Sequence, residues 1–203
     1  MTTSSPTTST TAPDPATERI LDAALLQFEE VGIRRTTVED IARRAGIERV
    51  TVYRRVGSKD DVVSAVVGRE AQRAFEALTG AIVGNSLEDR IAKGFTTIMR
   101  LLWNHTLANR LIELEPESAL PRLTTGGAEV LGAAVFTTVA MLDQAAREGL
   151  LDAADDFAVR AEVIVRIVHS FMMTQRVYLE LKTDDELSEF ARHYIYPIAA
   201  GIR

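Results

Sequence analysis

Apolar side chains recur at intervals of three and four residues along almost the whole chain, which is the spacing of one face of an α-helix. Between residues 20 and 31, for example, Ile20, Ala24, Phe28 and Val31 fall on one such face. Alternating runs typical of strands are scarce, and clusters of turn residues are sparse. The sequence therefore predicts an all-α protein of about nine helices.

Start and stop signals place these helices along the chain. The expected ranges are 17–31, 37–45, 48–56, 58–83, 87–103, 107–114, 125–148, 157–181 and 184–201. Three pairs are spaced as capping boxes, in which a hydroxyl and a carboxylate satisfy backbone N–H groups: Thr37 with Asp40, Ser58 with Asp61, and Thr183 with Glu186. Pro116 and Pro121 indicate an irregular connection, and Pro197 is expected to kink or end the last helix.

The 203 residues suffice for one large domain or two small ones, and we expect a boundary near residue 64. Residues 1–16 are rich in Thr, Ser, Pro and Ala, which predicts a solvated, disordered tail rather than a secretory signal. The chain has no cysteine, so disulfides and thiol chemistry are excluded. We find no apolar run typical of a membrane span, and therefore expect a cytoplasmic protein with no membrane partner.

Residues 36–59 read TTVEDIARRAGIERVTVYRRVGSK and carry the clearest functional signal. Two short helical segments flank a tight turn at 45–47, where Gly46 permits the backbone conformation that the turn needs. The small apolar side chains of Ile41, Ala42, Ile47 and Val52 are spaced to lock the two helices together. This pattern predicts a helix-turn-helix, with residues 17–64 as its domain and 65–203 as a second domain.

Charge is distributed unevenly along the chain. The whole sequence carries a net charge of -6, but residues 34–59 hold eight basic and three acidic residues, a net charge of +5. The rest of the chain therefore carries -11. A basic segment on an acidic body is typical of a local site for a polyanion such as DNA.

The ordered motifs of this region resemble the TetR family of bacterial transcriptional regulators over residues 17–67. The resemblance rests on FEEVG at 28–32, TTVEDIA at 36–42, AGI at 45–47, TVYR at 51–54 and SKDD at 58–61. Two positions depart from the family pattern: Arg55 stands where many members have histidine, and Val56 where many have an aromatic residue. Both departures are mild, because a basic and an apolar side chain are kept.

The resemblance implies a role for each matching residue in binding double-stranded operator DNA. Arg49 and Val50 would read bases in the major groove, the first through guanine and the second through a thymine methyl group. Contacts to the DNA would come from Thr37, Arg49, Val50, Thr51, Tyr53, Arg54, Arg55 and Lys59. Taken singly, arginines on a short helix are more often a solvated surface.

The remaining two thirds of the chain match the family only in length, helix count and apolar character. The segment 157–181 is apolar on nearly every side, so we expect a homodimer formed through the last two helices. The resemblance also implies an inducer pocket, with candidate lining residues Phe95, Met99, Trp103, His105, Phe136, Phe171, Met172 and Gln175. His169 is more typical of a hydrogen-bonded core or interface histidine than of a ligand contact.

The resulting hypothesis is a repressor that an apolar small molecule releases from a palindromic operator. The alternative is a dimeric DNA-binding protein with no effector, and the residues themselves do not distinguish a repressor from an activator. An enzyme is disfavoured because His105, His169 and His193 are far apart and no nucleophile motif or phosphate loop occurs. Metal and cofactor sites are likewise not expected, since cysteines and closely spaced histidines are absent.

Overall fold

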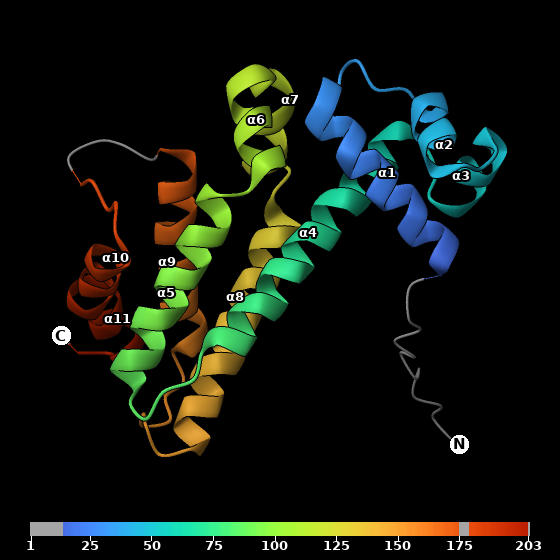
Figure 1. Cartoon of the computed structure of the whole chain (residues 1–203). Helices are drawn as coiled ribbons and strands as arrows, with labels where there is room; N and C mark the ends of the chain where they lie inside the picture. Colours follow the sequence, from blue (N-terminus) through green and yellow to red (C-terminus); the bar gives the residue numbers. More distant parts are fainter. Residues whose placement is uncertain (1–13, 175–178, 203) are drawn as a thin grey trace, which may run out of the picture. The chain divides into compact units, whose positions relative to one another are not determined.

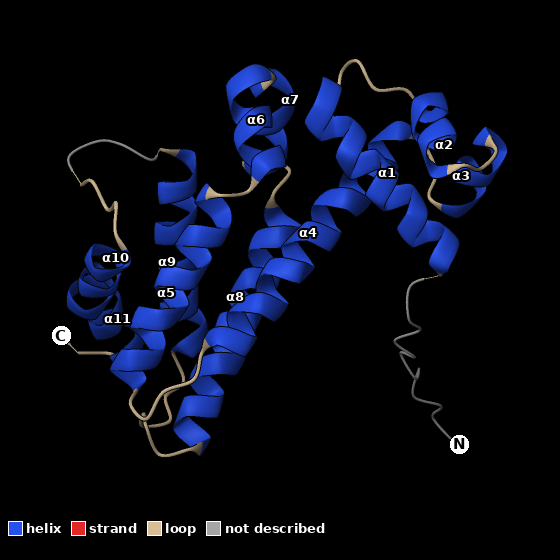
Figure 2. Cartoon of the chain, viewed as in Figure 1, coloured by secondary structure: helices blue, strands red, loops and turns tan. Residues whose placement is uncertain are grey.

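The computed structural model describes residues 14–174 and 179–202. Every regular element in these two stretches is a helix (Figure 2), which confirms the all-α prediction. The chain divides into two compact units, residues 1–66 and 67–203, and the division falls within helix α4 (Lys59–Ala81). Each unit has its own core and is described separately below.

The N-terminal unit contains α1 (Pro15–Val31), α2 (Val38–Ala45), α3 (Arg49–Arg55) and the first two turns of α4 (Figure 1). Its core is built from the apolar face that the periodicity predicted, with Ile20, Phe28, Ile41, Val52 and Val62 at most 1% exposed. Val52 is the buried residue of α3, so the remainder of that short helix is free to face solvent.

The C-terminal unit holds α5 (Leu87–Trp103), α6 (Thr106–Leu114), α7 (Pro116–Leu123), α8 (Ala128–Arg147) and α9 (Phe157–Met173). After residues 175–178 the chain continues through α10 (Asp184–Phe190), the π-helical turn η1 (Ala191–Ile195) and α11 (Tyr196–Ala200). In Figure 1 this C-terminal segment lies along α5, which also contacts α9. Phe95 of α5 and Phe171 of α9 meet Phe190 of α10, with ring centroids 5.3–6.2 Å apart.

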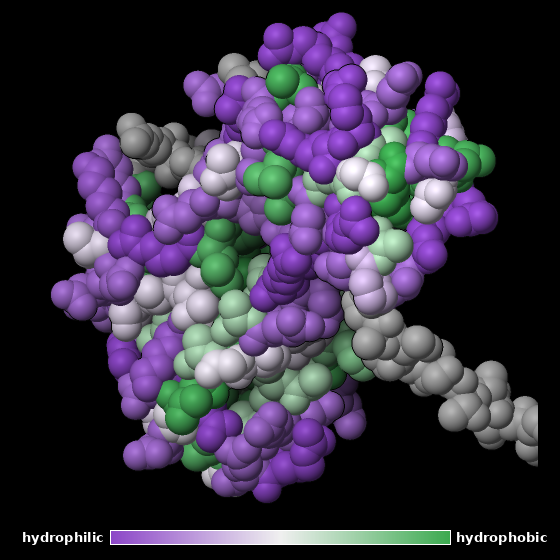
Figure 3. Space-filling model, turned by 45° about the vertical axis from the view of Figure 1, so that its right-hand side comes forward, coloured by the Kyte–Doolittle hydropathy of each residue, from purple (hydrophilic) through white to green (hydrophobic). Residues whose placement is uncertain are grey.

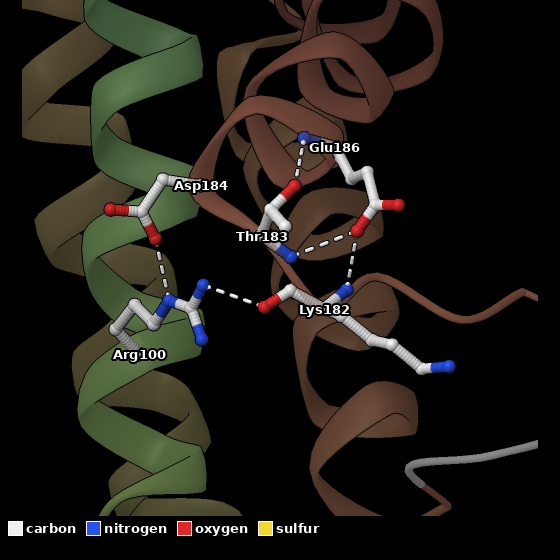
Figure 4. Close-up of polar contacts among 5 residues, drawn as sticks. All are labelled: Arg100, Lys182, Thr183, Asp184 and Glu186. Atoms are coloured by element: carbon white, nitrogen blue, oxygen red, sulfur yellow. Dashed lines mark hydrogen bonds and ion pairs between the residues drawn. The ribbon is translucent and has the colours of Figure 1, made fainter.

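The capping boxes at Thr37 and Thr183 are both confirmed. At the second, the Thr183 hydroxyl accepts from the Glu186 N–H at 3.2 Å, while the Glu186 carboxylate accepts from the Thr183 N–H at 2.8 Å (Figure 4). Arg100 of α5 then donates to the Asp184 carboxylate at 2.6 Å and to the Lys182 carbonyl at 2.9 Å. The capping box therefore sets the residue at which α10 begins, and Arg100 holds that end of the helix against α5.

Three expectations about helix bounds are wrong. Residues 116–123 form α7, because Pro116 occupies the first helical position, where its missing N–H costs nothing. The helix from 157 ends at Met173 instead of 181, and α1 starts at Pro15, inside the expected tail. Pro197, which is expected to kink or end the last helix, does not end it; it lies in the first turn of α11, directly after the π-helical turn that interrupts the α-helix. Residues 1–13 of the expected tail lie outside the described residues.

Candidate functional site

The turn between α2 and α3 depends on a left-handed residue. Gly46 has φ +64° and ψ +40°, a conformation that disfavours any residue with a Cβ atom. Its N–H donates to the Arg43 carbonyl at 3.2 Å, and the next N–H, of Ile47, donates to the Ala42 carbonyl at 3.0 Å. Arg19 of α1 braces this turn from outside, because its guanidinium donates to the Ala45 carbonyl at 2.6 Å.

The outer face of α3 presents an apolar and a basic group side by side. Val50 is 62% exposed and Tyr53 is 44% exposed, although both are apolar enough for a core. Arg49 donates to the Tyr53 hydroxyl at 3.1 Å, and its guanidinium carbon lies 5.3 Å from the centre of the tyrosine ring. This hydrogen bond raises the pKa of Arg49. Thr51, between them in sequence, is half-buried.

The other candidate phosphate contacts lie at helix termini or on the end of α3. Thr37 is the N-cap of α2, and its hydrogen bonds hold the pKa of Asp40 below the ordinary value. Lys59, the first residue of α4, donates to the Arg34 carbonyl at 3.1 Å and so ties α4 to the segment between α1 and α2. Arg54 is exposed, and Arg55 forms an ion pair with Asp14, directly before α1.

Two further arginines of this region are held within the protein. Arg44 makes two hydrogen bonds to the Glu30 carboxylate, at 2.6 and 2.7 Å, and Arg43 pairs with Asp40 one turn away on the same helix. Sequence reasoning identified the basic residues but not these acidic partners, nor the brace from Arg19. The partners are 14 or more residues away in sequence for Arg44, Arg55 and Arg19, so spacing gave no signal for them.

The C-terminal unit contains a partly open cavity of about 210 Å³ among α4, α5, α8 and α9. Of the sequence-predicted lining residues, Phe95 and Met172 line it. Met99 is fully buried elsewhere in the core, and Phe171 is in the aromatic cluster, where its carbonyl accepts from the Trp103 indole at 3.5 Å. Gln175 lies outside the described residues.

Two further candidates, like Met99, Trp103 and Phe171, do not line the cavity. His105 caps α6, where its Nδ1 accepts from the Ala108 N–H at 3.3 Å, and its Nε2 lies 3.8 Å from Glu70. Phe136 of α8 is 76% exposed. Sequence reasoning did not single out the α4 contribution to the lining, which consists of Val67, Ala71, Ala74, Phe75, Leu78 and Ile82. The apolar spacing of Phe75, Leu78 and Ile82 in this segment predicted a helix but gave no sign of a cavity.

Among the described residues, no group of three or more His, Asp or Glu side chains gathers in a way that would hold a metal ion. Within the same residues, α8 is long and apolar enough by length and composition to cross a membrane, although one such helix is weak evidence for a span. Figure 3 shows weakly polar and apolar residues reaching the surface between polar ones on the face it presents.

A short helix with exposed basic and polar side chains, joined by a left-handed glycine turn to a supporting helix, defines a helix-turn-helix DNA-binding domain. Residues 20–66 match the family model described as "Bacterial regulatory proteins, tetR family". The family match therefore covers the helix-turn-helix domain, about a quarter of the chain, and the remaining residues resemble structures of that family in fold alone.

This chain is similar to one curated protein in the sequence of its N-terminal part, and to several solved structures in fold. An uncharacterized HTH-type transcriptional regulator of Bacillus subtilis, YvkB, is 33% identical over 57 residues, which span 28% of this chain and 30% of YvkB. The TetR family repressor AlkX from a Dietzia species, implicated in biodegradation of n-alkanes, superposes with a TM-score of 0.70 at 19% identity, covering 92% of this chain and 95% of AlkX. The repressor QsdR of R. erythropolis gives 0.65 at 22% identity, covering 94% and 97%. The fatty acid degradation regulator FadR of Bacillus halodurans gives 0.62 at 20% identity, covering 95% and 99%.

Proposed function

We propose that this protein is a homodimeric repressor that binds a palindromic DNA operator and leaves it when a small apolar molecule occupies the C-terminal unit. The observation that carries the DNA-binding part is the outer face of α3, where Val50 and Tyr53 are exposed beside Arg49. Exposed apolar groups beside a basic group on a short helix match the base edges and thymine methyl groups of a major groove.

Base reading falls to Arg49 and Val50, near the start of α3. The guanidinium fork of Arg49 can donate to O6 and N7 of a guanine at once, and it gives up only one hydrogen bond, to Tyr53, in doing so. Phosphate contacts fall to Thr37, Tyr53, Arg54, Arg55 and Lys59. These contacts position α3 and carry no sequence information, so their loss weakens binding to all DNA sequences equally.

The dimer is proposed to form through a face shared by α8 and α9. Phe136 of α8 and Val159 and Val163 of α9 are large apolar residues that are exposed, and these two helices pack against each other. The segment 184–200, which the sequence suggested as the second dimer helix, buries its apolar face against α5 and is held there by Arg100. A four-helix interface from two copies of α8 and α9 would cover the exposed apolar groups.

A two-fold dimer of this kind suits a palindromic operator, because it repeats the reading head on two half-sites about one helical turn of DNA apart. Repression as the sign of regulation is supported by AlkX and QsdR, which are repressors with this fold. AlkX is also implicated in the biodegradation of n-alkanes, which supports an apolar effector. Such an effector acts only if it binds one geometry of the dimer better than the other.

The test is fluorescence anisotropy of the full-length protein with the DNA upstream of its own gene, using a random duplex as control and several salt concentrations. Tight, salt-sensitive binding that prefers the upstream DNA is expected. Absence of binding to either duplex at low salt would end the proposal. Upstream and random DNA bound equally would show an electrostatic surface without operator recognition.

Two variants separate reading from positioning. Arg49→Ala is expected to cost about 1–3 kcal/mol of binding to the preferred DNA and little on random DNA. Lys59→Ala is expected to weaken binding to both the preferred and the random DNA. It should also lower the slope of log affinity against log salt concentration by about one. Lys182→Ala, which removes the same charge from an exposed site in the C-terminal unit, is the matched control and should leave the slope unchanged.

A further inference from the structure

The walls of the cavity in the C-terminal unit contain few polar residues, and each of them already has a hydrogen-bond partner within the protein. Thr137 and Thr138 of α8 both reach the lining, but their hydroxyls donate to the Ala133 and Ala134 carbonyls of their own helix at 2.9 Å. Each threonine therefore turns its hydroxyl hydrogen to the helix backbone, and offers a ligand no donor without breaking that bond.

The basic lining residues are engaged in the same way. Arg90 donates from Nε to the Gly84 carbonyl at 2.9 Å and from Nη2 to the Glu148 carboxylate, an ion pair that lowers the pKa of Glu148 and keeps it charged. Arg122 donates to the Ser118 carbonyl at 2.8 Å. His169 Nε2 lies 2.7 Å from the Leu123 carbonyl, which accepts only, so this nitrogen carries the hydrogen.

We propose that the cavity selects an uncharged, hydrocarbon-like molecule by shape alone, and that it rejects a carboxylic acid of the same size. This inference rests on the proposed function, because it names the effector of the same regulator. A carboxylate in this cavity would have to draw a basic group away from its present partner (Arg90 from Glu148, Arg122 from the Ser118 carbonyl or His169 from the Leu123 carbonyl) or remain unpaired among apolar side chains. Breaking an existing contact of a basic residue and burying an unpaired carboxylate both cost binding free energy. An uncharged molecule incurs neither cost.

The size of the cavity sets the size of the molecule. A dry apolar cavity of about 150 Å³ is known to hold benzene, so 210 Å³ admits a ring with a short alkyl chain or a comparable open chain. Gly94 of α5 bounds one side, since a Cβ atom there would lie 3.0 Å from Ile82 Cδ1 and 3.8 Å from Leu78 Cδ1 of α4. The absence of a side chain at this position therefore keeps the Ile82 and Leu78 side chains of α4 in place around the space.

The first experiment is calorimetric titration of the full-length protein at pH 7 with propylbenzene and with 3-phenylpropionate, in which a carboxylate replaces the terminal methyl group. We expect propylbenzene to bind and 3-phenylpropionate to bind roughly 100-fold more weakly or not at all. Along the series from benzene to butylbenzene, affinity should rise about fourfold per CH2 until the cavity is full. Equal or tighter binding of the acid would overturn the proposal, and so would absence of binding by the whole neutral series.

A pair of variants on α4 locates the binding. Ala74 lines the cavity, whereas Ala77, on the same helix, is exposed and does not. Ala74→Leu is expected to fill the cavity and weaken propylbenzene binding at least tenfold. Ala77→Leu should leave the affinity for propylbenzene unchanged. Unchanged affinity in Ala74→Leu, in a variant that keeps its helical circular dichroism, would place the ligand elsewhere and refute the proposal.

The same ligands, added to the DNA complex, keep this inference separate from the proposed function. Propylbenzene that binds in the calorimeter but leaves DNA affinity unchanged would support the ligand class and contradict the induced release. DNA release by 3-phenylpropionate and not by propylbenzene would support induction and overturn the ligand class. Release by propylbenzene alone, lost in Ala74→Leu, is the expected result.

Discussion

Replacing Gly46 by alanine tests whether the turn that positions α3 needs a left-handed residue. At φ +64°, a residue with a Cβ atom costs about 1–2 kcal/mol relative to glycine. Part of this is offset, because alanine also restricts the unfolded chain by about 0.4–1 kcal/mol. The new Cβ would lie 3.4 Å from the Arg19 guanidinium, a flexible group that can move slightly, so the steric contribution is small. The expected net loss of stability is about 1 kcal/mol.

The assay must report the N-terminal unit. The single tryptophan, Trp103, lies in the C-terminal unit, so its fluorescence is not suitable. Amide hydrogen exchange in α2 and α3 measures local opening directly, and a loss of about 1 kcal/mol should accelerate it about fivefold. Exchange in α5 and α9 should not change, which provides an internal control.

Gly46→Asn is the matched variant, because asparagine tolerates the left-handed region better than alanine does. Its exchange rates in α2 and α3 should fall between those of the native protein and Gly46→Ala. If Gly46→Ala exchanges as slowly as the native protein, the turn does not have the backbone conformation described here. If asparagine is as unfavourable as alanine, the loss comes from the contact with Arg19 and not from the backbone.

Three further outcomes can be measured. Phe136→Glu places a charge on the proposed α8–α9 interface and should convert a dimer to monomers in analytical ultracentrifugation; an unchanged dimer would move the interface elsewhere. Asp14→Asn frees Arg55 for phosphate and should tighten DNA binding about two- to fivefold at low salt, whereas Asp152→Asn, an equal charge change in the other unit, should not. The pKa of Asp40 is lowered in the folded state by Thr37, so its contribution is present above pH 3.8 and is lost as the pH falls through the lowered pKa. Thr37→Val should therefore flatten the loss of α2 protection in acid, and an unchanged acid profile of hydrogen exchange would contradict this.

Local signals in the sequence predicted a large part of the fold. Hydroxyl–carboxylate spacing located the starts of α2 and α10, and the four-residue apolar spacing located the core of α1. These features depend on residues within one or two turns of each other, so the sequence contains all the information they need. The end of α9 at Met173 was missed, because apolar residues continue to position 181 and no local stop signal intervenes.

The candidate sites divide in the same way. The exposed face of α3 follows from the burial of Val52 alone, so the sequence could identify Arg49, Val50 and Tyr53. The cavity could not be predicted from the sequence, because the same apolar pattern arises whether a large apolar residue lines a cavity, fills a core or contacts a partner. Phe95 and Phe136 illustrate the difference, since the first lines the cavity and the second is exposed on α8.

The π-helical turn η1 reconciles an unusual spacing in the last helix. Leu187, Ala191, Ile195 and Ala199 are all at most 1% exposed and are each separated by four residues. In a regular α-helix of 3.6 residues per turn, such a series drifts by about 40° per step, or about 120° in all. The wider turn at 191–195 absorbs this drift by holding one residue more than the α-helix needs. A one-residue deletion within η1 should therefore be tolerated better than one in α5 or α9, and relatives that lack the turn should differ in length at this point.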